Sequence, residues 1–413
     1  MKRVVITGLG AVTPVGNNVA TMWDNAKKGV CGIAEITAFD TTDFKVKLAA
    51  EAKDFDATTV LTKQEVRKLD RFVQFALVAA REAYDDSALE GNVDKTRMGV
   101  SVSSGIGGLY TIEETANKLV AAGPNRISPH FIPKVLTNLA AGNVAIHLGA
   151  KGQCHTVVTA CAAGTDAIGT AFHHIQAGRA DVMITGGAEA SITPLGIAGF
   201  SIIRAVSEAT DKTRASMPFD AERNGFVMGE GAGILVLESL EHAQARGAKI
   251  YGEVVGYGAT CDAFHVTAPA EDGEGAVRAM TMALADAEIS ADAIDYINAH
   301  GTSTPLNDKT ETLAVKAAFG EHARELVMSS TKGMTGHMLG AAGAVEAILT
   351  VKSLEDGFVL PTLNHQVADE ACDLDIVPNV GRSEELRYAM SNSLGFGGHN
   401  ASVIFKKWEA SDF

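Results

Sequence analysis

The sequence has few of the features that mark disulfide-rich, membrane-spanning or nucleic-acid-binding proteins. Its 5 cysteines are scattered over 413 residues without a C-x-x-C pair, which indicates neither a disulfide framework nor a zinc ribbon and favours a cytoplasmic location. Lys and Arg number 35 against 50 Asp and Glu, and the net charge of −15 argues against nucleic acid as a partner. The longest stretch without Asp, Glu, Lys or Arg covers residues 388–405, and its serines, asparagines and glycines exclude membrane insertion.

Proline is also scarce, whereas glycine is abundant. The chain has 10 prolines and 42 glycines, and the glycines exceed their usual share of roughly 7%. With 46% hydrophobic residues the chain can bury a large core, so wholesale disorder is excluded. Because so few prolines do not suit a Pro/Gly-rich linker protein, the glycines are expected inside folded structure.

Apolar runs typical of strands alternate along the chain with stretches of helical spacing. The strand-like runs lie at residues 4–6, 98–102, 182–184, 234–237, 254–255, 294–297 and 327–328. The helical stretches lie at residues 72–84, 162–175, 276–287 and 341–354. This alternation predicts an α/β fold with largely parallel sheets that are covered on both faces.

A weak internal repeat accompanies this alternation. Residues 3–13 resemble residues 250–260 as a strand followed by glycines, and the strand-then-serine segment 98–108 resembles 326–336. The repeat predicts two similar βαβ-type halves, residues 1–250 and residues 251–413, each with a small-residue helix that begins near one common centre.

Cys161 stands where an extended apolar segment turns into a helix rich in alanine and glycine. A thiol at a helix start faces unpaired backbone N–H groups and the positive end of the helix dipole, and both favour the nucleophilic thiolate. The alternative is a buried, inert cysteine. The other four cysteines lack this setting, so an inert role is expected for them.

Two histidines follow in glycine-punctuated segments. His300 comes directly after the predicted strand 294–297, where α/β proteins gather functional groups, and is followed by Thr302 and Thr304, whose hydroxyls could bond a polar ligand. His337 precedes the predicted helix 341–354. Both could instead be turn or capping residues.

A lysine and a glutamate accompany the second histidine. Lys332 lies five residues before His337, and the two could hold an oxyanion or a carboxylate at the helix start. Glu346 falls in the apolar helix and would need a cationic partner, for which Lys332 is the obvious candidate. A solvated lysine is the alternative.

Phe396 lies between glycines in the segment 390–400, which suits either a mobile aromatic gate or a plain glycine-rich turn. No complete G-x-G-x-x-G, H-E-x-x-H, G-x-S-x-G or Walker motif occurs, so the sequence predicts neither a nucleotide cofactor nor a catalytic metal.

Taken together, the motifs around Cys161, His300, His337 and Phe396 resemble those of the β-ketoacyl-acyl-carrier-protein synthases of the thiolase-like superfamily. The resemblance runs from VVITGLGAVTPVG near the start, through SMPFDAERNGFVMGEGAG, to SNSLGFGGHN near the end. The segment ADVMITGGAEASITPLGIAGF is similar to the type II class. This resemblance implies two superposable halves in a layered α-β-α-β-α core, and a homodimer.

The resemblance also implies a decarboxylating Claisen condensation that elongates fatty acids by two carbons and needs no redox cofactor. Cys161 would accept an acyl chain from acyl carrier protein as a thioester. His300 and His337 would assist decarboxylation of malonyl-carrier protein and stabilise the enolate oxygen. The carbanion would then attack the acyl thioester, with the N–H groups of Cys161 and Phe396 as the oxyanion hole.

Further positions match functional residues of the family. Lys332 with Glu346 would order the site, and Phe396 would gate it. The remaining matches are Ile106 and Phe200 in the acyl pocket, Thr267, Thr302 and Thr304 for substrate and its phosphopantetheine arm, Lys63, Arg67, Lys68 and Arg204 for carrier docking, and Asn298, Glu346 and Asn392, which in some relatives surround a monovalent cation. Leu394 replaces a phenylalanine common in the family, which affects pocket packing rather than chemistry. Because the carrier is itself acidic, docking requires a local positive patch against the overall negative charge.

Four alternatives stay open. A polyketide-type ketosynthase or a non-catalytic chain-length partner would share the family's motifs, although the latter lacks the nucleophilic cysteine. A papain-like hydrolase would need one Cys–His–Asn array. A module that only binds acyl chains would release no carbon dioxide from malonyl-carrier protein.

Overall fold

The computed structural model describes residues 1–409, in which strands and helices alternate as the sequence predicts. The strands are β1 Val4–Val12, β2 Ala34–Glu35, β3 Leu48–Ala49, β4 Met98–Ser103, β5 Cys154–His155, β6 Val182–Glu189, β7 Gly231–Ser239, β8 Gly252–Cys261, β9 Tyr296–Asn298, β10 Val327–Ser329, β11 Phe358–Val359, β12 Arg382–Ser383, β13 Tyr388–Gly395 and β14 His399–Lys407. The helices are α1 Val19–Lys27, α2 Lys63–Lys68, α3 Arg71–Asp86, α4 Leu109–Ala122, α5 Phe131–Val135, α6 Leu139–Leu148, α7 Ala163–Gln176, α8 Pro194–Ile202, α9 Leu240–Ala245, α10 Glu274–Asp286, α11 Pro305–Phe319, α12 Lys332–Thr335 and α13 Ala342–Asp356.

The central sheet consists of two five-stranded groups with the same internal order. The full order is β10-β9-β13-β14-β8-β1-β7-β6-β4-β5. When the strands of each group are numbered by their order along the chain, both groups run third, second, fourth, fifth, first from the outer edge of the sheet to its centre. In both groups the first three of these strands pair in parallel and the remaining pairs are antiparallel. The prediction of largely parallel sheets is therefore wrong, because the last strands of each group return through antiparallel pairs. The groups join where Val4–Ile6 of β1 pairs with β8.

Of the two segment pairs that suggested an internal repeat, one corresponds in the structure and the other does not. β1 and β8 are the first strands of the two groups, as the resemblance between residues 3–13 and 250–260 predicts. The pairing of 98–108 with 326–336 is wrong, because β4 is the second strand of its group and β10 is the third. A boundary between residues 250 and 251 stays a prediction.

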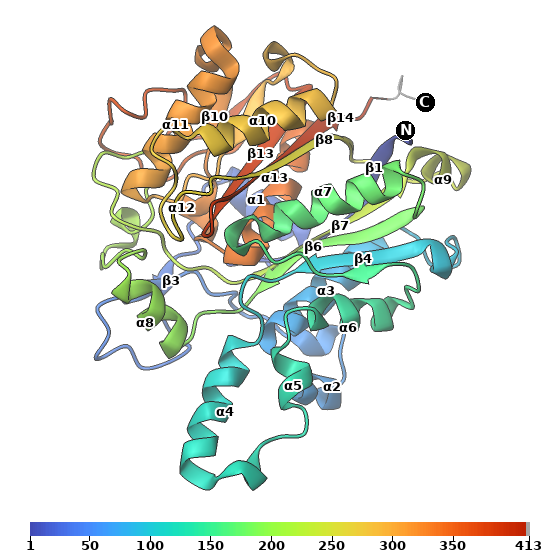
Figure 1. Cartoon of the computed structure of the whole chain (residues 1–413), viewed down its shortest axis with the longest axis vertical. Coiled ribbons are helices and arrows are strands. Elements are labelled where there is room, and N and C mark those ends of the chain that lie inside the picture. Colours follow the sequence, from blue (N-terminus) through green and yellow to red (C-terminus); the bar gives the residue numbers. More distant parts are fainter. Residues whose placement is uncertain (410–413) are drawn as a thin grey trace.

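Helices cover the two strand groups in layers (Figure 1). α7 and α13 pack against each other and against strands of both groups, and so form the middle layer. α3 packs on β1 and β7 on one outer side, while α10 packs on β8 and β14 on the other. These layers confirm the predicted α/β thiolase-like architecture.

Glycines allow the outer helices to approach their strands closely. A Cβ at Gly8 or Gly10 of β1 would come within 2.2 or 1.9 Å of α3 carbonyl oxygens. The same holds for Gly256 and Gly258 of β8, where a Cβ would meet α10 carbonyl oxygens at 2.3 and 2.2 Å. The repeated glycines of the sequence therefore mark two equivalent helix–strand contacts.

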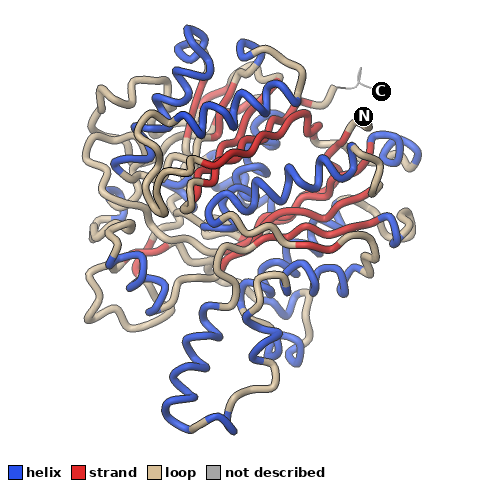
Figure 2. The backbone as a smooth tube through the Cα atoms, viewed as in Figure 1, coloured by secondary structure: helices blue, strands red, loops and turns tan. Residues whose placement is uncertain are grey.

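Loops gather at the end of the molecule away from the two labelled ends of the chain (Figure 2). Within residues 1–409, no helix is both long enough and apolar enough to cross a membrane.

Candidate active site

Cys161 lies in a strained turn at the start of α7. Residues Ala160–Ala162 form a single 3₁₀ turn that leads into the helix. Ala160 has a φ of +49°, a left-handed conformation that a residue with a side chain adopts at a cost of about 1–3 kcal/mol. The Thr159 hydroxyl donates to Asp166 Oδ2 at 2.5 Å, which fastens the entrance of the turn to the first turn of α7.

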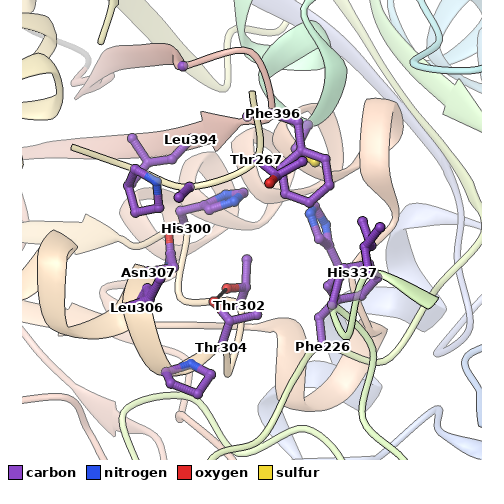
Figure 3. Close-up of a pocket in the computed structure, with 18 of the residues that line it drawn as sticks. Phe226, Thr267, His300, Thr302, Thr304, Leu306, Asn307, His337, Leu394 and Phe396 are labelled. Atoms are coloured by element: carbon purple, nitrogen blue, oxygen red, sulfur yellow. Dashed lines mark hydrogen bonds between the residues drawn. The ribbon is translucent and has the colours of Figure 1, made fainter. Parts of the chain in front are cut away.

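The turn opens on a cavity of about 380 Å³. The sequence-predicted residues that line it are Cys161, Phe200, Arg204, Thr267, His300, Thr302, Thr304, His337, Leu394 and Phe396. In Figure 3, His300 and His337 face the same hollow, with Phe396 on one side of them and Thr302 and Thr304 on the other. Ile106 and Phe200 both pack against the apolar cluster that contains Cys161.

The two histidine rings lie perpendicular to each other, with centroids 5.3 Å apart. The Leu339 N–H points at Nδ1 of His337 at 3.3 Å, so that this nitrogen accepts and Nε2 carries the proton. Burial, together with the nearby Lys332 cation, lowers the pKa of both histidines well below its usual value. Both imidazoles are therefore neutral near pH 7 and can act as hydrogen-bond donors without carrying charge.

Lys332 is fully buried behind the histidines and forms an ion pair with Glu346. Its Nζ also donates to the carbonyl oxygen of His300 at 2.6 Å. Glu311 accepts the backbone N–H groups of His300 and Gly301, each at 2.8 Å. The backbone that carries His300 is thus held from two directions.

The protonation state of Cys161 differs from the sequence-based expectation, which was a stabilised thiolate. Burial raises its pKa to about 12, although Lys332 and the N–H groups of Phe396 and Cys161 act in the opposite direction. Desolvation of the buried thiolate outweighs these favourable interactions. The resting thiol is therefore neutral near pH 7.

Phe396 lies in the glycine-rich tip of the hairpin between β13 and β14. Gly397 and Gly398 complete the tip with φ values of +89° and +76°, which favour glycine. A Cβ at Gly395 would lie 2.8 Å from the Thr159 carbonyl oxygen and 3.2 Å from the Cys161 nitrogen. Glycine at this position lets the hairpin press on the Cys161 turn, which brings the N–H groups of Phe396 and Cys161 to the same sulfur.

Sequence reasoning missed several residues of this site. Phe226 stacks edge-on against His337 at 5.1 Å, and Asp262 and Asn400 line the cavity. Glu311, which holds the His300 backbone, occurs in α11 with no spacing that distinguishes it from a surface acid. Phe226 lies in the SMPFDAERNGF segment, whose match to the family was the one available signal.

The four basic residues predicted for carrier docking do not form one surface. Arg204 is exposed at the cavity, whereas Lys63, Arg67 and Lys68 are exposed on α2. Figure 1 shows α2 near α5, well away from α8, which precedes Arg204. Within one subunit they form two separate surfaces.

The buried neutral histidines predict a loss of stability in acid. The unfolded state binds protons near pH 6.5 and the folded state only at lower pH, so unfolding becomes easier as pH falls below about 6.5. Each histidine contributes a slope of up to about 1.4 kcal/mol per pH unit. Denaturant unfolding between pH 5 and 6.5 should show that the free energy of unfolding depends less steeply on pH in His337→Asn than in the unmodified protein.

The control for this measurement is His265→Asn, which removes an exposed histidine. An equal pH slope in the unmodified protein and in His337→Asn would contradict the assignment of a neutral buried imidazole.

Ketosynthases are among the solved structures with this arrangement of strands and helices. The ishigamide ketosynthase/chain length factor superposes with a TM-score of 0.93 at 36% identity, covering 99% of this chain and 100% of that one. A beta-ketoacyl synthase from Burkholderia phymatum superposes with a TM-score of 0.92 at 35% identity, with the same coverage. Fold and cavity thus place the chain among the thiolase-like condensing enzymes.

Models of the beta-ketoacyl synthase N-terminal and C-terminal domains match residues 1–243 and 251–366. The chain belongs to the beta-ketoacyl synthase family. It is 55% identical over 410 residues to the 3-oxoacyl-[acyl-carrier-protein] synthase 2 of Staphylococcus aureus (strain COL), covering 99% of each chain. It is 51% identical over 410 residues to the protein of that name from Synechocystis, again covering 99% of each chain.

Proposed function

We propose that the chain is a 3-oxoacyl-[acyl-carrier-protein] synthase of the type II class, a condensing acyltransferase of fatty acid elongation. The observation that carries the proposal is one cavity that holds the Cys161 thiol, two neutral imidazoles and a pair of backbone N–H groups directed at the sulfur. The full-length similarity to two proteins named for this activity supports the same assignment.

In the first half of the reaction, the acyl chain moves from the carrier's thiol to Cys161. The Cys161 sulfur attacks the carbonyl carbon of the incoming thioester while its proton leaves, and the developing oxyanion is held by the N–H groups of Cys161 and Phe396. The carrier thiolate departs and takes up a proton. The acyl chain then occupies the apolar cluster beside Cys161, which includes Ile106 and Phe200.

In the second half, malonyl-carrier protein loses carbon dioxide and supplies the new carbon–carbon bond. The electron pair of the broken bond forms an enolate, whose oxygen is held by the His300 and His337 imidazoles. The enolate carbon attacks the acyl-Cys161 carbonyl, and the tetrahedral intermediate collapses with loss of the Cys161 thiolate. That thiolate regains a proton, favoured by its raised pKa. Lys332 and Glu346 act behind the histidines by fixing the His300 backbone.

The test is condensation of radiolabelled malonyl-carrier protein with acyl-carrier primers of graded length. The proposal expects one labelled 3-oxoacyl product, longer by two carbons, and one carbon dioxide for each primer consumed. Release of the free acid without any malonyl requirement would identify a hydrolase instead. A ketosynthase bound to a hexaketide, solved in complex with its type II polyketide-synthase acyl-carrier protein, is 36% identical to this chain, and a requirement for polyketide primers would favour that alternative.

Carrier docking is proposed at Lys63, Arg67 and Lys68 of α2 and, on the cavity side, at Arg204. The support is exposure: all four cations reach solvent in a chain of net charge −15. The double variant Arg67→Glu/Lys68→Glu is expected to raise the KM for carrier-bound substrate by about tenfold at low salt, and less at high salt. Steady-state kinetics at graded ionic strength measure both effects.

A matched control makes the same change of net charge elsewhere. Lys28→Glu/Lys151→Glu reverses two exposed lysines outside α2 and should leave the KM within about twofold. Equal KM values for the α2 double variant and the unmodified protein would exclude the patch.

Two neighbouring surfaces support the proposal of a homodimer. β5 ends the central sheet with an open edge, and an unpaired strand edge invites pairing with another chain. Val158 and Ile146 lie within ten residues of β5 in the sequence, and they are 49% and 81% exposed. Sedimentation equilibrium of the full chain should give twice the mass of one subunit, and a monomer at micromolar concentration would oppose the proposal.

No redox cofactor takes part in this proposed mechanism, since each step is carried by side chains, backbone N–H groups and phosphopantetheine-bound substrates.

A structural monovalent cation fits residues behind the histidines. Both amide atoms of buried Asn298 and one carboxylate oxygen of Glu346 lack a hydrogen-bond partner, and Asn392 lies on β13, next to β9. Asn298, Glu346 and Asn392 would hold such an ion.

Five free cysteines support the proposed cytoplasmic location.

A further inference from the structure

The loop that carries Thr302 and Thr304 is bonded on the side away from the cavity to residues 217–225. The Met217 N–H donates to Ser303 Oγ at 2.9 Å, and the Gly225 N–H donates to the Ser303 carbonyl oxygen at 3.0 Å. Ser303 has a φ of +68°, which a serine keeps only when its surroundings hold it. The two threonine hydroxyls lie 2.8 Å apart and line the cavity. Their direction depends on this backbone.

Arg223 provides the strongest of these attachments. Its Nε donates to the Thr304 carbonyl oxygen at 3.1 Å and its Nη2 to the Pro305 carbonyl oxygen at 2.8 Å. Nη1 donates to the Asp220 carbonyl oxygen at 2.9 Å and pairs with Asp369 at 2.5 Å. The guanidinium is nearly buried, with 6% of the side chain exposed. Its rigid fork therefore fixes two successive peptide groups at the start of α11.

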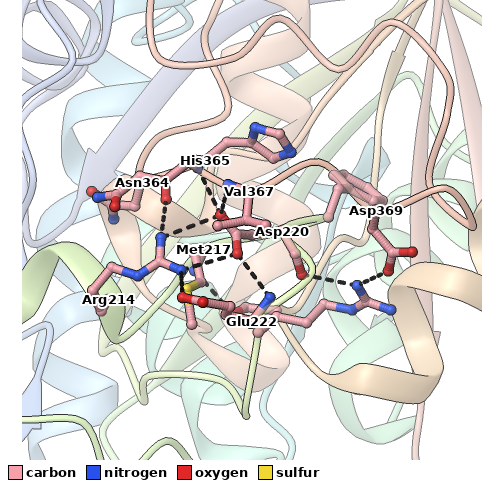
Figure 4. A network of polar contacts seen from close by, with 12 residues as sticks. Arg214, Met217, Asp220, Glu222, Asn364, His365, Val367 and Asp369 are labelled. Atoms are coloured by element: carbon pink, nitrogen blue, oxygen red, sulfur yellow. Dashed lines mark hydrogen bonds and ion pairs between the residues drawn. The ribbon is translucent and has the colours of Figure 1, made fainter.

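The segment that holds Arg223 is itself held by a network of hydrogen bonds and ion pairs (Figure 4). The fully buried Asp220 carboxylate pairs with Arg214 at 3.0 Å and accepts the N–H groups of Glu222, Gln366 and Val367. These hydrogen bonds lower the pKa of Asp220 to about 2 against the opposing effect of burial, so the carboxylate stays charged. Arg214 belongs to this network, and its hydrogen bonds go to Asp220, Glu222 and the Asn364 carbonyl oxygen.

We propose that Arg223 is a positioning residue for recognition of the pantetheine arm of the substrate. It holds the backbone of Thr304 and Pro305 back from the cavity, so that the Thr302 and Thr304 hydroxyls point at the amide groups of an entering pantetheine. The inference rests on the proposed function, in which these hydroxyls contact the arm. It predicts a defect in binding of pantetheine thioesters rather than in the chemistry at Cys161.

The test compares two hexanoyl donors in single-turnover acylation of Cys161, followed by mass spectrometry of the intact full-length protein. Hexanoyl-pantetheine carries the amide groups, whereas S-ethyl thiohexanoate offers the same acyl chain without any amide. Arg223→Met should raise the half-saturating concentration of hexanoyl-pantetheine about tenfold, with the maximum rate within about twofold. Acylation by S-ethyl thiohexanoate should change by less than about twofold. Arg223→Lys should fall between Arg223→Met and the unmodified protein.

Arg214→Lys is the matched control, because it perturbs the same segment without a hydrogen bond to residues 302–305. It should leave both donors within about twofold of the unmodified protein. Equal losses with both donors in Arg223→Met and Arg223→Lys, or a loss in Arg214→Lys as large as in Arg223→Met, would overturn the positioning role. If the unmodified protein is acylated by neither donor, the proposed function itself fails.

Discussion

Replacing Cys161 by alanine is expected to reduce formation of the 3-oxoacyl product by at least about 10³-fold while decarboxylation of malonyl-carrier protein continues. The elongation step needs a covalent acyl thioester, and Cys161 is the one cysteine that lines the cavity. In the proposed mechanism, enolate formation uses His300 and His337, which this substitution leaves in place. Product analysis and carbon dioxide release, measured in the same reaction, separate the two steps.

Two further variants sharpen this result. Cys154→Ala removes an exposed thiol and should keep both activities. His300→Ala/His337→Ala should still accept an acyl chain on Cys161 but release no carbon dioxide. Elongation by Cys161→Ala at the unmodified rate would exclude the synthase assignment, and loss of acylation together with decarboxylation in the histidine variant would refute the division of roles.

Replacing Lys332 by methionine is expected to lower the free energy of unfolding by about 3–5 kcal/mol. The ammonium group pairs with Glu346 where both side chains are nearly inaccessible, 1% and 3% exposed, so its removal leaves an uncompensated buried charge. The His300 carbonyl oxygen also loses its donor at 2.6 Å. Denaturant unfolding measures the first effect, and carbon dioxide release from malonyl-carrier protein measures the second.

The double variant Lys332→Met/Glu346→Gln separates these two effects. Removing both charges should recover most of the lost stability, because no unpaired ion remains. Activity should not recover, since His300 still lacks its positioning lysine. A double variant as unstable as Lys332→Met would show that the ion pair does not account for the loss. Full activity in Lys332→Met would refute the positioning role.

Much of the fold could be predicted because its strands are short apolar runs and its central helices are rich in small residues. The runs at residues 182–184 and 234–237 became β6 and β7, and the stretches at 162–175 and 341–354 became α7 and α13. The hairpin of β13 and β14 was missed as a pair of strands. Its buried Ser391, Asn392 and Ser393 interrupt the apolar pattern on which strand prediction depends.

The site was predictable where a residue type is rare in its setting. A cysteine at a helix start and a glutamate inside an apolar helix are unusual enough to attract attention in the sequence. The thiol pKa was not predictable, because the balance between desolvation and nearby N–H groups depends on how completely the cavity closes around Cys161. Arg223 and Glu311 act through backbone groups distant in sequence, and such contacts leave no local pattern.

The turn that presents Cys161 has a twin in the other half of the chain. Leu339 has the same φ of +49° as Ala160 and begins a 3₁₀ turn, Leu339–Ala341, that leads into α13 as Ala160–Ala162 leads into α7. Gly340 occupies the position of the nucleophile there, and a Cβ would lie 2.3 Å from the Gly105 nitrogen and 2.8 Å from Glu189 Oε2. Glu189 accepts the N–H groups of both Gly105 and Gly340 at that point. The second turn therefore presents no thiol and leaves no space for one, because the Glu189 carboxylate fills the place beside Gly340, so that of the two turns Cys161 alone offers a nucleophilic side chain.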